Sequence, residues 1–578
     1  MLSSPNSNGN ILLILFKHSG LKKFSTNLEV EDRPSPLQQL FEQDQIMLLS
    51  IFTIFFFSAI FYLLSKVKKK FDDHGFKLNL PPSPPKLPII GNIHQISPMI
   101  HHSFRNLSSK YGPLMLLNLG TRPVLVVSSA EMTAQILKTN DLVFSNRFSI
   151  KAAKVIFCGG NDLLLAPYGD YWRKVRKFCV LELLSNKRIQ SFQFVREEEV
   201  LRVMERINCA ASEPGMSINL TEILFTTLNT IIFRCSLGDN FNKDYVDSFV
   251  GLIRKATMLM ESICFEDFFP LLKWVDVLNG LQGKLDKTSQ ELDTFFNRVI
   301  DDHLSSEEHG CNHDKMNFID LLLLHAEEAN LILSRENIKG IIMDMFVGGS
   351  DTTATAIEWS MAELIKNPRL MKKAQEEVRR VVGKKMKVDE QDINHMEYLK
   401  CIVKESLRLH PPLPNLVGRV STAAAKFGNY DIPTNTGVFI NSWAIQRDPD
   451  LWDKPEEFCP ERFINNPVDF KGRDFQFIPF GSGRRRCPGM AFGLAVVEVL
   501  LANLLYQFNW ELHGGAKCEE LDMTEGFGIT VNRKIPLHVV PILFHSASTR
   551  HIKSRASRAV LCQGVKRDVS CCALLVKS

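Results

Sequence analysis

Apolar and charged residues alternate with a helical rhythm from about residue 93 to residue 545, and no long Gly/Ser or Pro stretch interrupts it. Two short stretches of β-like composition, residues 114–119 and 123–127, precede the main helical part. Because domain boundaries usually coincide with flexible linkers, we expect one large domain over residues 93–545, mainly α with small β-sheets.

The clearest helical pattern runs from about Arg335 to Asn367. Ser334 is a suitable N-cap, and Pro368 is expected to end the helix at the residue before it. At 1.5 Å per residue this helix would be roughly 50 Å long, enough to cross the whole domain.

Residues 46–64 form an uncharged apolar run, IMLLSIFTIFFFSAIFYLL. This run has about the 20 residues needed to span a hydrocarbon core. Lysines at 66, 68, 69 and 70 follow, and basic residues are retained on the cytosolic side. We therefore expect a single transmembrane anchor at 46–65, with the domain in the cytosol. The alternative, a cleaved signal peptide, fits less well because the run is long and no small-residue cleavage site follows it.

Residues 66–92 combine this basic stretch with the segment LPPSPPKLP, whose prolines predict a stiff, extended hinge. The segments 1–45 and 546–578 lack regular patterning. We interpret the first as an extension upstream of a natural start at Met47, with a plastid-directing segment as the alternative. We expect neither end to carry function.

The formal net charge of +5 is spread along the chain and gives little support for nucleic-acid binding. The 13 cysteines are scattered without a C-x-x-C pair, which favours a reducing compartment over a disulfide framework.

The most specific segment is FGSGRRRCPG at residues 480–489. Its glycines permit a tight turn, and Cys487 lies at the end of that turn, just before a helical run over residues 490–505. The helix dipole and nearby cations favour the thiolate form of such a cysteine, and a thiolate can ligate a metal. The three arginines suit carboxylates as partners. The alternative is a structural cysteine beside a basic surface turn.

The segment GGSDTT at residues 348–353 interrupts the long helical pattern. Two consecutive glycines cost roughly 1 kcal/mol each in helix propensity, so they need a reason such as the close approach of another group. The adjacent acid and alcohols could relay protons. The alternative is close helix packing by the glycines, with threonines that bond back to the helix.

Two further patterns are weaker alone. Glu405 and Arg408 lie three residues apart, on one helix face, and PERF follows at 460–463. Trp172 and Arg176 form a W-x-x-x-R pattern, for which an amphipathic helix start is the alternative.

In this order, over roughly residues 80–543, these segments resemble the cytochrome P-450 family of haem-thiolate monooxygenases. Phe480, Gly483, Arg485, Cys487 and Gly489 match its signature F-x-x-G-x-R-x-C-x-G. The segment NSWAI at 441–445 is similar to plant microsomal members of specialised metabolism, many of which oxidise terpenoids or alkaloids.

The resemblance implies the cytochrome P-450 fold, haem b as cofactor and Cys487 as the axial ligand of its iron. It implies Thr352 and Asp351 as catalytic residues, with Thr352 forming a hydrogen bond to iron-bound oxygen and Asp351 helping to relay protons. It implies a buried structural triad of Glu405, Arg408 and Arg462. The other implied cofactor-binding residues are Phe480, Gly483, Arg485, Gly489, Trp172, Arg176 and Arg419. Arg419 stands in Gly-Arg-Val where that group often has Pro-Arg-Glu, so its role depends on how this loop is set.

The implied activity is an NADPH- and O2-dependent hydroxylation or epoxidation of a lipophilic small molecule at the endoplasmic reticulum membrane. Electrons are expected from NADPH through NADPH-cytochrome P-450 reductase, docked near Cys487. The expected pocket residues are Met345, Phe346, Gly348, Gly349, Asn415, Leu416, Val417, Phe527, Gly528 and Ile529. The aromatic group Phe265, Phe268, Phe269 and Trp274 could roof this pocket, dip into the bilayer or pack in the core. The alternatives for the whole chain are a haem-thiolate isomerase or dehydratase that needs no reductase, and a non-catalytic membrane haem-binding protein.

Overall fold

The computed structural model describes residues 55–56, 78–239, 241–305, 316–328 and 333–544, with only the backbone for 325–328. The predicted extensions 1–45 and 546–578 lie outside these residues. So does the predicted anchor, apart from Phe55 and Phe56. Contacts divide the chain into two units. The described part of the first is 55–56, 78–80 and 428–431, where the Asn79 amide donates to Asp431 Oδ2 at 3.0 Å. The second comprises residues 81–427 and 432–544.

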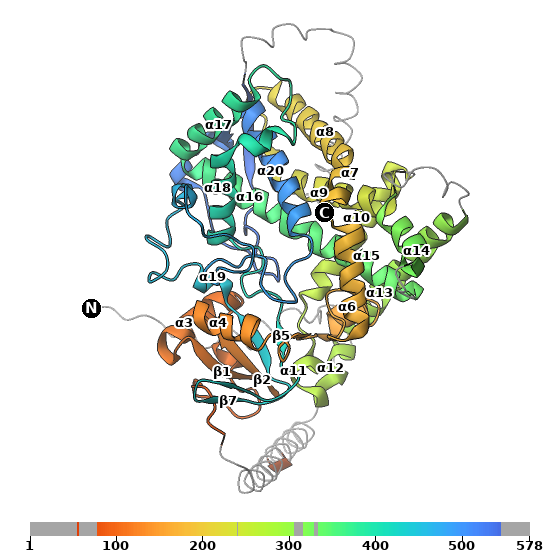
Figure 1. Cartoon of the computed structure of the whole chain (residues 1–578), viewed down its shortest axis with the longest axis vertical. Helices are drawn as coiled ribbons and strands as arrows, with labels where there is room; N and C mark the ends of the chain where they lie inside the picture. The colour runs from red at the N-terminus through yellow and green to blue at the C-terminus, as the bar shows by residue number, and fades with distance from the viewer. Residues whose placement is uncertain (1–54, 57–77, 240, 306–315, 329–332, 545–578) are drawn as a thin grey trace, which may run out of the picture. The chain divides into compact units, whose positions relative to one another are not determined.

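Helices dominate the described residues, as predicted (Figure 1). The first nine are α3 (Ile100–Tyr111), α4 (Ala130–Ala134), α5 (Lys151–Ile156), α6 (Asp170–Phe178), α7 (Asn186–Ser191), α8 (Gln193–Ala211), α9 (Leu220–Leu237), α10 (Lys243–Met260) and α11 (Phe265–Phe268). They are followed by α12 (Lys273–Leu278), α13 (Leu281–Ser305), α14 (Phe318–Glu328), α15 (Arg335–Gly349), α16 (Asp351–Lys366), α17 (Pro368–Val382), α18 (Glu397–Leu409), α19 (Ser442–Ile445) and α20 (Met490–Gln507).

The strands are short and form small sheets, as predicted. They are β1 (Leu114–Leu119), β2 (Arg122–Val127), β3 (Asn146–Arg147), β4 (Ile218–Asn219), β5 (Arg419–Val420), β6 (Ala425–Phe427), β7 (Tyr430–Ile432), β8 (Gly437–Ile440), β9 (Phe508–Leu512) and β10 (His538–Leu543). One sheet has the order β1-β2-β8-β5-β3, and another has the order β4-β10-β9. Strands β3 and β5 pair antiparallel with Arg147 opposite Arg419, which places two arginines side by side.

The predicted long helix is present but is broken at Ser350 into α15 and α16. Ser334 caps α15 in a reciprocal capping box with Asn337, which confirms the predicted start. Helix α16 ends at Lys366 with Asn367 as its C-cap, and Pro368 starts α17 directly, because proline is well tolerated in the first turn of a helix.

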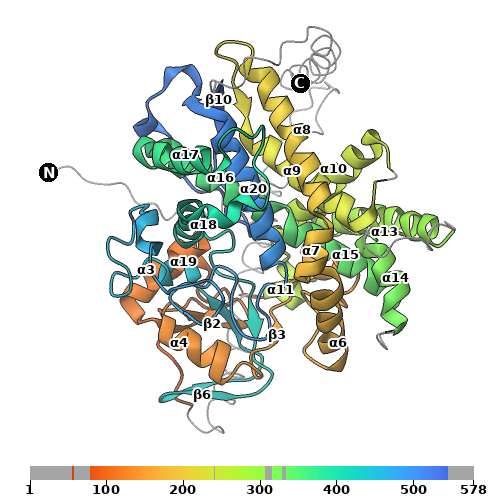
Figure 2. The ribbon, with the colours of Figure 1, turned by 45° about the horizontal axis from the view of Figure 1, so that its top comes forward.

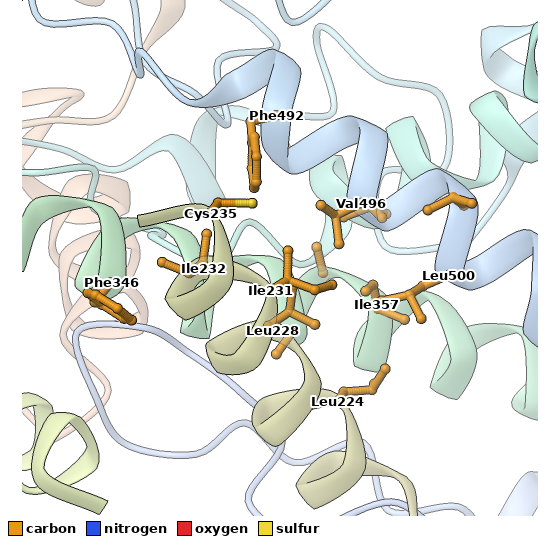
Figure 3. Packing of buried hydrophobic residues seen from close by; sticks show 14 of the residues in the cluster. Leu224, Leu228, Ile231, Ile232, Cys235, Phe346, Ile357, Phe492, Val496 and Leu500 are labelled. Carbon is orange, nitrogen blue, oxygen red and sulfur yellow. The ribbon is translucent and has the colours of Figure 1, made fainter. Parts of the chain in front are cut away.

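The core lies where α9, α15, α16 and α20 pack together (Figures 1 and 2). Figure 3 shows Ile231 of α9 and Ile357 of α16 beside Val496 and Leu500 of α20. Among the described residues, α9 and α20 are long and apolar enough to cross a membrane, but most of each helix is buried inside the protein. They are therefore core helices. A smaller core lies between α3 and the β1–β2 hairpin, around Phe104, Met115 and Val124.

Candidate functional site: the cysteine loop and its surroundings

The Cys487 loop is a tight turn at the start of α20. Gly481 and Gly483 have φ angles of 67° and 70°, and the Cys487 amide donates to the Phe480 carbonyl at 3.0 Å. A Cβ on Gly483 would lie 2.5 Å from the Leu137 carbonyl oxygen and 2.7 Å from Asp141 Oδ1, so only glycine fits there. The turn leaves Cys487 partly buried, three residues before α20 begins at Met490.

The electrostatic environment of Cys487 differs from the expectation. Burial raises the pKa of the Cys487 thiol, although the Gly489 amide and the neighbouring Arg176 and Arg486 lower it. The helix start and the cations alone therefore do not favour the thiolate, since desolvation outweighs them. A metal ion bound to the sulfur would supply the missing stabilisation, because a coordinating thiol is deprotonated.

Only one of the three consecutive arginines points inward. Arg485 is buried and donates to the carbonyls of Ser145 (2.7 Å) and Leu163 (3.3 Å). Its guanidinium lies 4.1 Å from the centre of the Trp172 ring. In contrast, the Arg484 side chain is 51% exposed, and Arg486 donates to the Lys471 carbonyl at the surface. The prediction that the loop brings a buried cation to the site thus applies to Arg485.

Four guanidinium groups gather around this loop. Arg147 joins Arg176, Arg419 and Arg485. Burial, followed by repulsion from these three arginines, holds the pKa of Arg147 well below its usual range. Burial, followed by repulsion from Arg419 and Arg176, lowers the pKa of Arg485 to about 9. A buried cluster of like charges is costly without counter-ions. Two carboxylates, such as the propionates of haem, would relieve it.

The carboxylate Asp141 holds part of this arrangement in place. Its Oδ1 accepts from Arg419 Nη1 at 2.9 Å, and its Oδ2 accepts from the Arg484 backbone amide at 2.9 Å. Arg419 also donates to the Ser482 carbonyl at 2.9 Å. The altered Gly-Arg-Val loop therefore still places Arg419 beside the cysteine loop. No signal in one sequence distinguishes Asp141 or Arg147 from other acids and arginines, so both were missed.

Trp172 and Arg176 lie on α6, on the same side of the loop. Trp172 is buried and its Nε1 donates to the Leu163 carbonyl at 2.9 Å, while Arg176 donates to the Arg486 carbonyl. An open depression of about 430 Å³ lies over this part of α6. Its lining residues are Tyr168, Trp172, Arg173, Arg176, Lys177, Val180, Leu181 and Arg484.

The two glycines at the end of α15 have different surroundings. A Cβ on Gly349 would lie 2.8 Å from Ile232 Cδ1 on α9, so Gly349 permits close helix packing. A Cβ on Gly348 would meet nothing within 4 Å, and Gly348 is exposed. The packing alternative therefore accounts for Gly349, while Gly348 leaves open space beside the helix break.

Polar groups capable of proton transfer cluster at that break. Burial raises the pKa of Asp351 to about 6, although Arg254 lowers it. Thr352 Oγ1 donates back to the Gly348 carbonyl at 2.7 Å. The hydroxyl of Ser350 is buried without a hydrogen-bond partner among the described residues. Since buried polar groups normally have partners, the Ser350 hydroxyl keeps hydrogen-bonding capacity that the described residues do not use.

Thr353 links this helix to the cysteine helix. A Cβ on Gly493 of α20 would lie 3.6 Å from Thr353 Oγ1. The contact shows that the break between α15 and α16 faces the first turn of α20, and so brings residues 348–353 to the same region of the fold as the cysteine loop.

The predicted ionic triad is brought together in the core. Arg408 Nε donates to Glu405 Oε2 at 2.7 Å, and Arg462 Nε donates to Glu405 Oε1 at 2.9 Å. The side chains of Glu405 and Arg408 are fully buried. Glu405 also accepts from the Cys459 amide at 2.8 Å, so one carboxylate ties α18 to the PERF segment.

The predicted pocket residues separate into two groups. Phe346 is fully buried against Phe233 and Phe249, with ring centres 6.4 and 4.8 Å away, and Met345 is only 8% exposed. The structure therefore places Phe346 in the core and not at a pocket wall, because its helix turns that side chain toward α9 and α10.

The other predicted positions are more accessible. Phe527 and Ile529 are 56% and 47% exposed. Asn415 Oδ1 is buried without a partner among the described residues, and Leu416 and Val417 are partly buried. Gly528 is packed tightly, since a Cβ there would lie 2.6 Å from Glu261 Oε1. Glu261, which sequence reasoning missed, also accepts from the Ile529 amide at 3.1 Å.

Comparison with known proteins identifies the fold and the family. The family model of cytochrome P450 matches residues 81–537. A phenylacetaldehyde oxime monooxygenase of Prunus mume is 49% identical over 490 residues, covering 84% of this chain and 93% of that protein. Cytochrome P450 71A1 of Persea americana is 51% identical over 456 residues, covering 78% and 91%. Psoralen synthase of Ammi majus is 48% identical over 464 residues, covering 80% and 92%.

Among solved structures, a zebrafish cytochrome P450 with progesterone matches with a TM-score of 0.66 at 23% identity. The match covers 76% of this chain and 99% of that chain and supports the fold. Fold, cysteine loop and relatives together define a haem-binding monooxygenase of plant specialised metabolism. The chain belongs to the cytochrome P450 family.

Proposed function

We propose that this protein is an NADPH- and O2-dependent monooxygenase that hydroxylates or epoxidises a lipophilic terpenoid or alkaloid at the endoplasmic reticulum membrane. The observation that carries the proposal is the Cys487 loop, in which one thiol at the start of α20 faces a cluster of buried arginines. When bound, haem supplies the activation of O2 and the transfer of one oxygen atom to the substrate.

The residues of the site take the following roles. Cys487 holds the iron as a thiolate ligand. Arg485, Arg176, Arg419 and also Arg147 would pair with the two propionates, whose charges would offset the crowding of these four guanidinium groups, of which Arg419 and Arg485 are the buried ones. Trp172 stacks against Arg485 and orients it. Phe480, Gly483 and Gly489 shape the turn, and Gly483 is required there because no Cβ fits beside Asp141.

The helix break supplies protons. Asp351 has a pKa of about 6, so it can take up and release a proton near neutral pH. Thr352 in the first turn of α16 and Ser350 at the helix break offer further hydroxyl groups. We assign the proton path to these three residues, with the open space beside Gly348 as the place where the reacting groups meet it.

The depression over α6 is the docking place for the reductase. It lies next to Arg484 of the cysteine loop and contains Arg173, Arg176 and Lys177. Cationic surfaces attract acidic partners and speed their association at low salt. Electrons delivered here have a short path to Cys487, because α6 and the cysteine loop are in contact through Arg176.

A second surface faces the membrane. Leu271, Trp274, Val277 and Leu278, on α12 and the turn before it, are 91%, 55%, 63% and 77% exposed. The Phe268 carbonyl just before them accepts from the Thr121 amide of the β1–β2 turn at 3.0 Å.

The hinge reaches the same turn. The Gly120 amide of the β1–β2 turn donates to the Ile90 carbonyl at 3.2 Å, and the neighbouring Ile89 is 68% exposed. The hinge follows the predicted anchor in sequence, so this apolar surface lies where a single-pass enzyme would rest on the bilayer. Of the predicted aromatic group, Trp274 belongs to this surface.

The substrate is expected to be lipophilic. Phe527 and Ile529 present apolar surface at the tip of a C-terminal hairpin, and Glu261 adds one carboxylate beside them. Burial raises the pKa of Glu261, with a further contribution from Asp351, although the Ile529 amide lowers it. The relatives named above include a phenylacetaldehyde oxime monooxygenase and a psoralen synthase, so enzymes this similar differ in substrate.

The test is a spectral titration of the purified full chain, reconstituted in lipid, with a panel of terpenoids, indole alkaloids and phenolics. We expect a thiolate-haem spectrum and a shift from low to high spin with one substrate class. Cys487→Ser is expected to remove the thiolate spectrum, and Cys518→Ser, outside the site, is expected to retain it.

Turnover of the responsive substrate is then measured with and without NADPH and reductase. Dependence on both supports the monooxygenase. Conversion without either would indicate the isomerase or dehydratase alternative, and a thiolate-haem protein that converts no member of the panel would favour the non-catalytic alternative.

A further inference from the structure

Two adjacent histidines of α3 meet a glutamate from the C-terminal part of the chain. Nε2 of His101 lies 2.7 Å and Nε2 of His102 lies 2.8 Å from the same oxygen, Glu525 Oε2. The three potential ligand atoms all lie within 4.8 Å of one another. Two imidazole nitrogens thus converge on one carboxylate oxygen, and none of the three residues belongs to the candidate haem site.

The cluster is held in place by a surrounding shell. Trp443 Nε1 donates to the other carboxylate oxygen, Glu525 Oε1, at 3.1 Å, and the Trp443 ring stacks on His102 with a centroid distance of 4.5 Å. Partners of this kind orient metal ligands in proteins and fix which oxygen faces the metal. The site is therefore already organised. Trp443 holds Glu525 Oε1, and Glu525 Oε2 faces the two histidine nitrogens.

Access to the cluster is one-sided. The side chain of His101 is 2% exposed and that of Glu525 is 12% exposed, whereas His102 is 44% exposed. A site with two ligands fixed by burial and a third at the surface leaves room for a water as the fourth ligand, from the side of His102.

We propose that His101, His102 and Glu525 form a binding site for a divalent transition-metal ion, with Zn²⁺ as its probe. Imidazole nitrogen and carboxylate oxygen are ligands that Zn²⁺ accepts, and two histidines with one glutamate are a known ligand set for it. The ion takes the place of the hydrogens that lie between the nitrogens and the oxygen.

The geometry requires a small expansion. Tetrahedral Zn²⁺ with bonds of about 2.0–2.1 Å separates its ligand atoms by about 3.3 Å. The present nitrogen–oxygen separations of 2.7 and 2.8 Å must therefore increase by about 0.5 Å, and the two nitrogens, which lie within 4.8 Å of each other, must take up the same spacing. His102 can make this movement because its outer side faces solvent.

Nearby charges limit the affinity. Arg447 lies over the Trp443 ring at 4.1 Å, and Arg105 lies over it at 5.2 Å. Both arginines share one counter-ion, Glu456, at 3.1 and 2.8 Å. The three charged side chains Arg105, Arg447 and Glu456, together with Glu525, carry no net charge, so long-range attraction of a cation is weak. We therefore expect micromolar rather than nanomolar binding, provided by coordination.

Metal binding would act on the predicted substrate loop. The backbones of Glu525 and Arg533 form an antiparallel β-bridge. The Gly526 amide donates to the Asn532 carbonyl at 2.7 Å, so these residues close a hairpin. Phe527 follows only two residues after Glu525. A metal at the cluster would tie the base of this hairpin to α3 and restrain its tip. This consequence rests on the proposed function, whereas metal binding itself does not.

The first test is calorimetric titration of the haem-loaded full chain with Zn²⁺ in a non-chelating buffer. His102→Gln keeps an N–H donor toward Glu525 but removes the imidazole ligand, and it changes a side chain that is half exposed, so the fold is retained. We expect one micromolar site in the unmodified protein, binding at least tenfold weaker in His102→Gln, and no change in the control His513→Ala, which alters an exposed histidine elsewhere. Equal affinity in His102→Gln, or no binding to the unmodified protein, overturns the proposed site.

The second test follows hydrogen exchange of residues 525–533 with and without Zn²⁺. We expect at least threefold slower exchange of this hairpin in the unmodified protein and no change in His102→Gln. Binding without slower exchange overturns the link to the substrate loop. Failure of the thiolate spectrum would overturn the proposed function instead, and would leave the metal measurement intact.

Discussion

Replacing Glu405 by glutamine tests whether the buried triad stabilises the core. The change removes one negative charge and leaves the shape of the side chain nearly intact. Arg408 and Arg462 then remain beside a neutral amide, with Arg408 fully buried and Arg462 11% exposed. Breaking a buried ion pair by removing one partner typically costs about 3–5 kcal/mol, because the remaining charge is left buried without compensation.

The structure points to the lower end of that range. Arg408 also donates to the carbonyls of Gln446 and Pro455, both at 2.7 Å, so its charge is partly solvated by backbone oxygens even without Glu405. We therefore expect Glu405→Gln to lower the free energy of unfolding by about 3 kcal/mol.

The assay is urea unfolding of the haem-loaded protein, followed by tryptophan fluorescence and haem absorbance. The control is Glu457→Gln, which breaks an exposed pair with Lys454 in which both side chains are about two-thirds exposed. Such a pair contributes at most about 1 kcal/mol. If Glu405→Gln and Glu457→Gln reduced stability equally, the argument from burial would be refuted.

Three further changes test other parts of the site. Gly349→Ala should destabilise the protein by about 1–3 kcal/mol because its Cβ meets Ile232 at 2.8 Å, whereas Gly348→Ala, in open space, should not; comparable urea midpoints for the two would contradict this difference. Because burial raises the pKa of Asp351 to about 6 from about 3.8, the stability linked to its neutral form is present below pH 4 and lost as pH rises through 6. Asp351→Asn should abolish this fall in the free energy of unfolding with rising pH, which amounts to up to about 3 kcal/mol. A variant with the same dependence of stability on pH as the unmodified protein would contradict the assignment to Asp351. Lys177→Glu should raise the KM for reductase several-fold at low salt and not at high salt, measured by initial rates; no salt dependence would exclude the α6 depression as the docking surface.

Several local features followed directly from the sequence. The capping box at Ser334 depends only on residues within one helical turn, and the turn of FGSGRRRCPG depends on the glycines within it. Strand β1 was predicted with the bounds it has, because a short apolar run of β-like composition is a local signal. The mainly α class and the family resemblance rest on such short-range patterns, and the fold and the comparisons confirm both.

The direction of side chains along the long helix was less predictable. Met345, Phe346 and Gly349 were all expected at the pocket, but Phe346 and Gly349 pack toward α9. The apolar pattern of this segment extends all around the helix, since both sides of it are covered by protein. A helix that is apolar on all sides carries no sequence signal for which face lines a cavity.

The composition of the candidate site was decided by long-range pairing. Arg147 meets Arg419 only because β3 pairs with β5 in one register, across 272 positions in the sequence, and a shift of one residue would turn Arg147 to the other face. Tertiary contacts over several hundred residues likewise bring Asp141 to the cysteine loop and Glu525 to His101.

The sequence by itself therefore determined the helical class, the family and the local turns and caps, such as the Ser334 capping box and the glycine turn before Cys487. The tertiary structure decided which arginines share a buried site, which glycine packs and which is open, and that two histidines meet a distant glutamate. The physical reason is that local patterns are governed by backbone preferences within a few residues. Electrostatic and metal-binding clusters instead depend on distances between segments that only the packed core brings together.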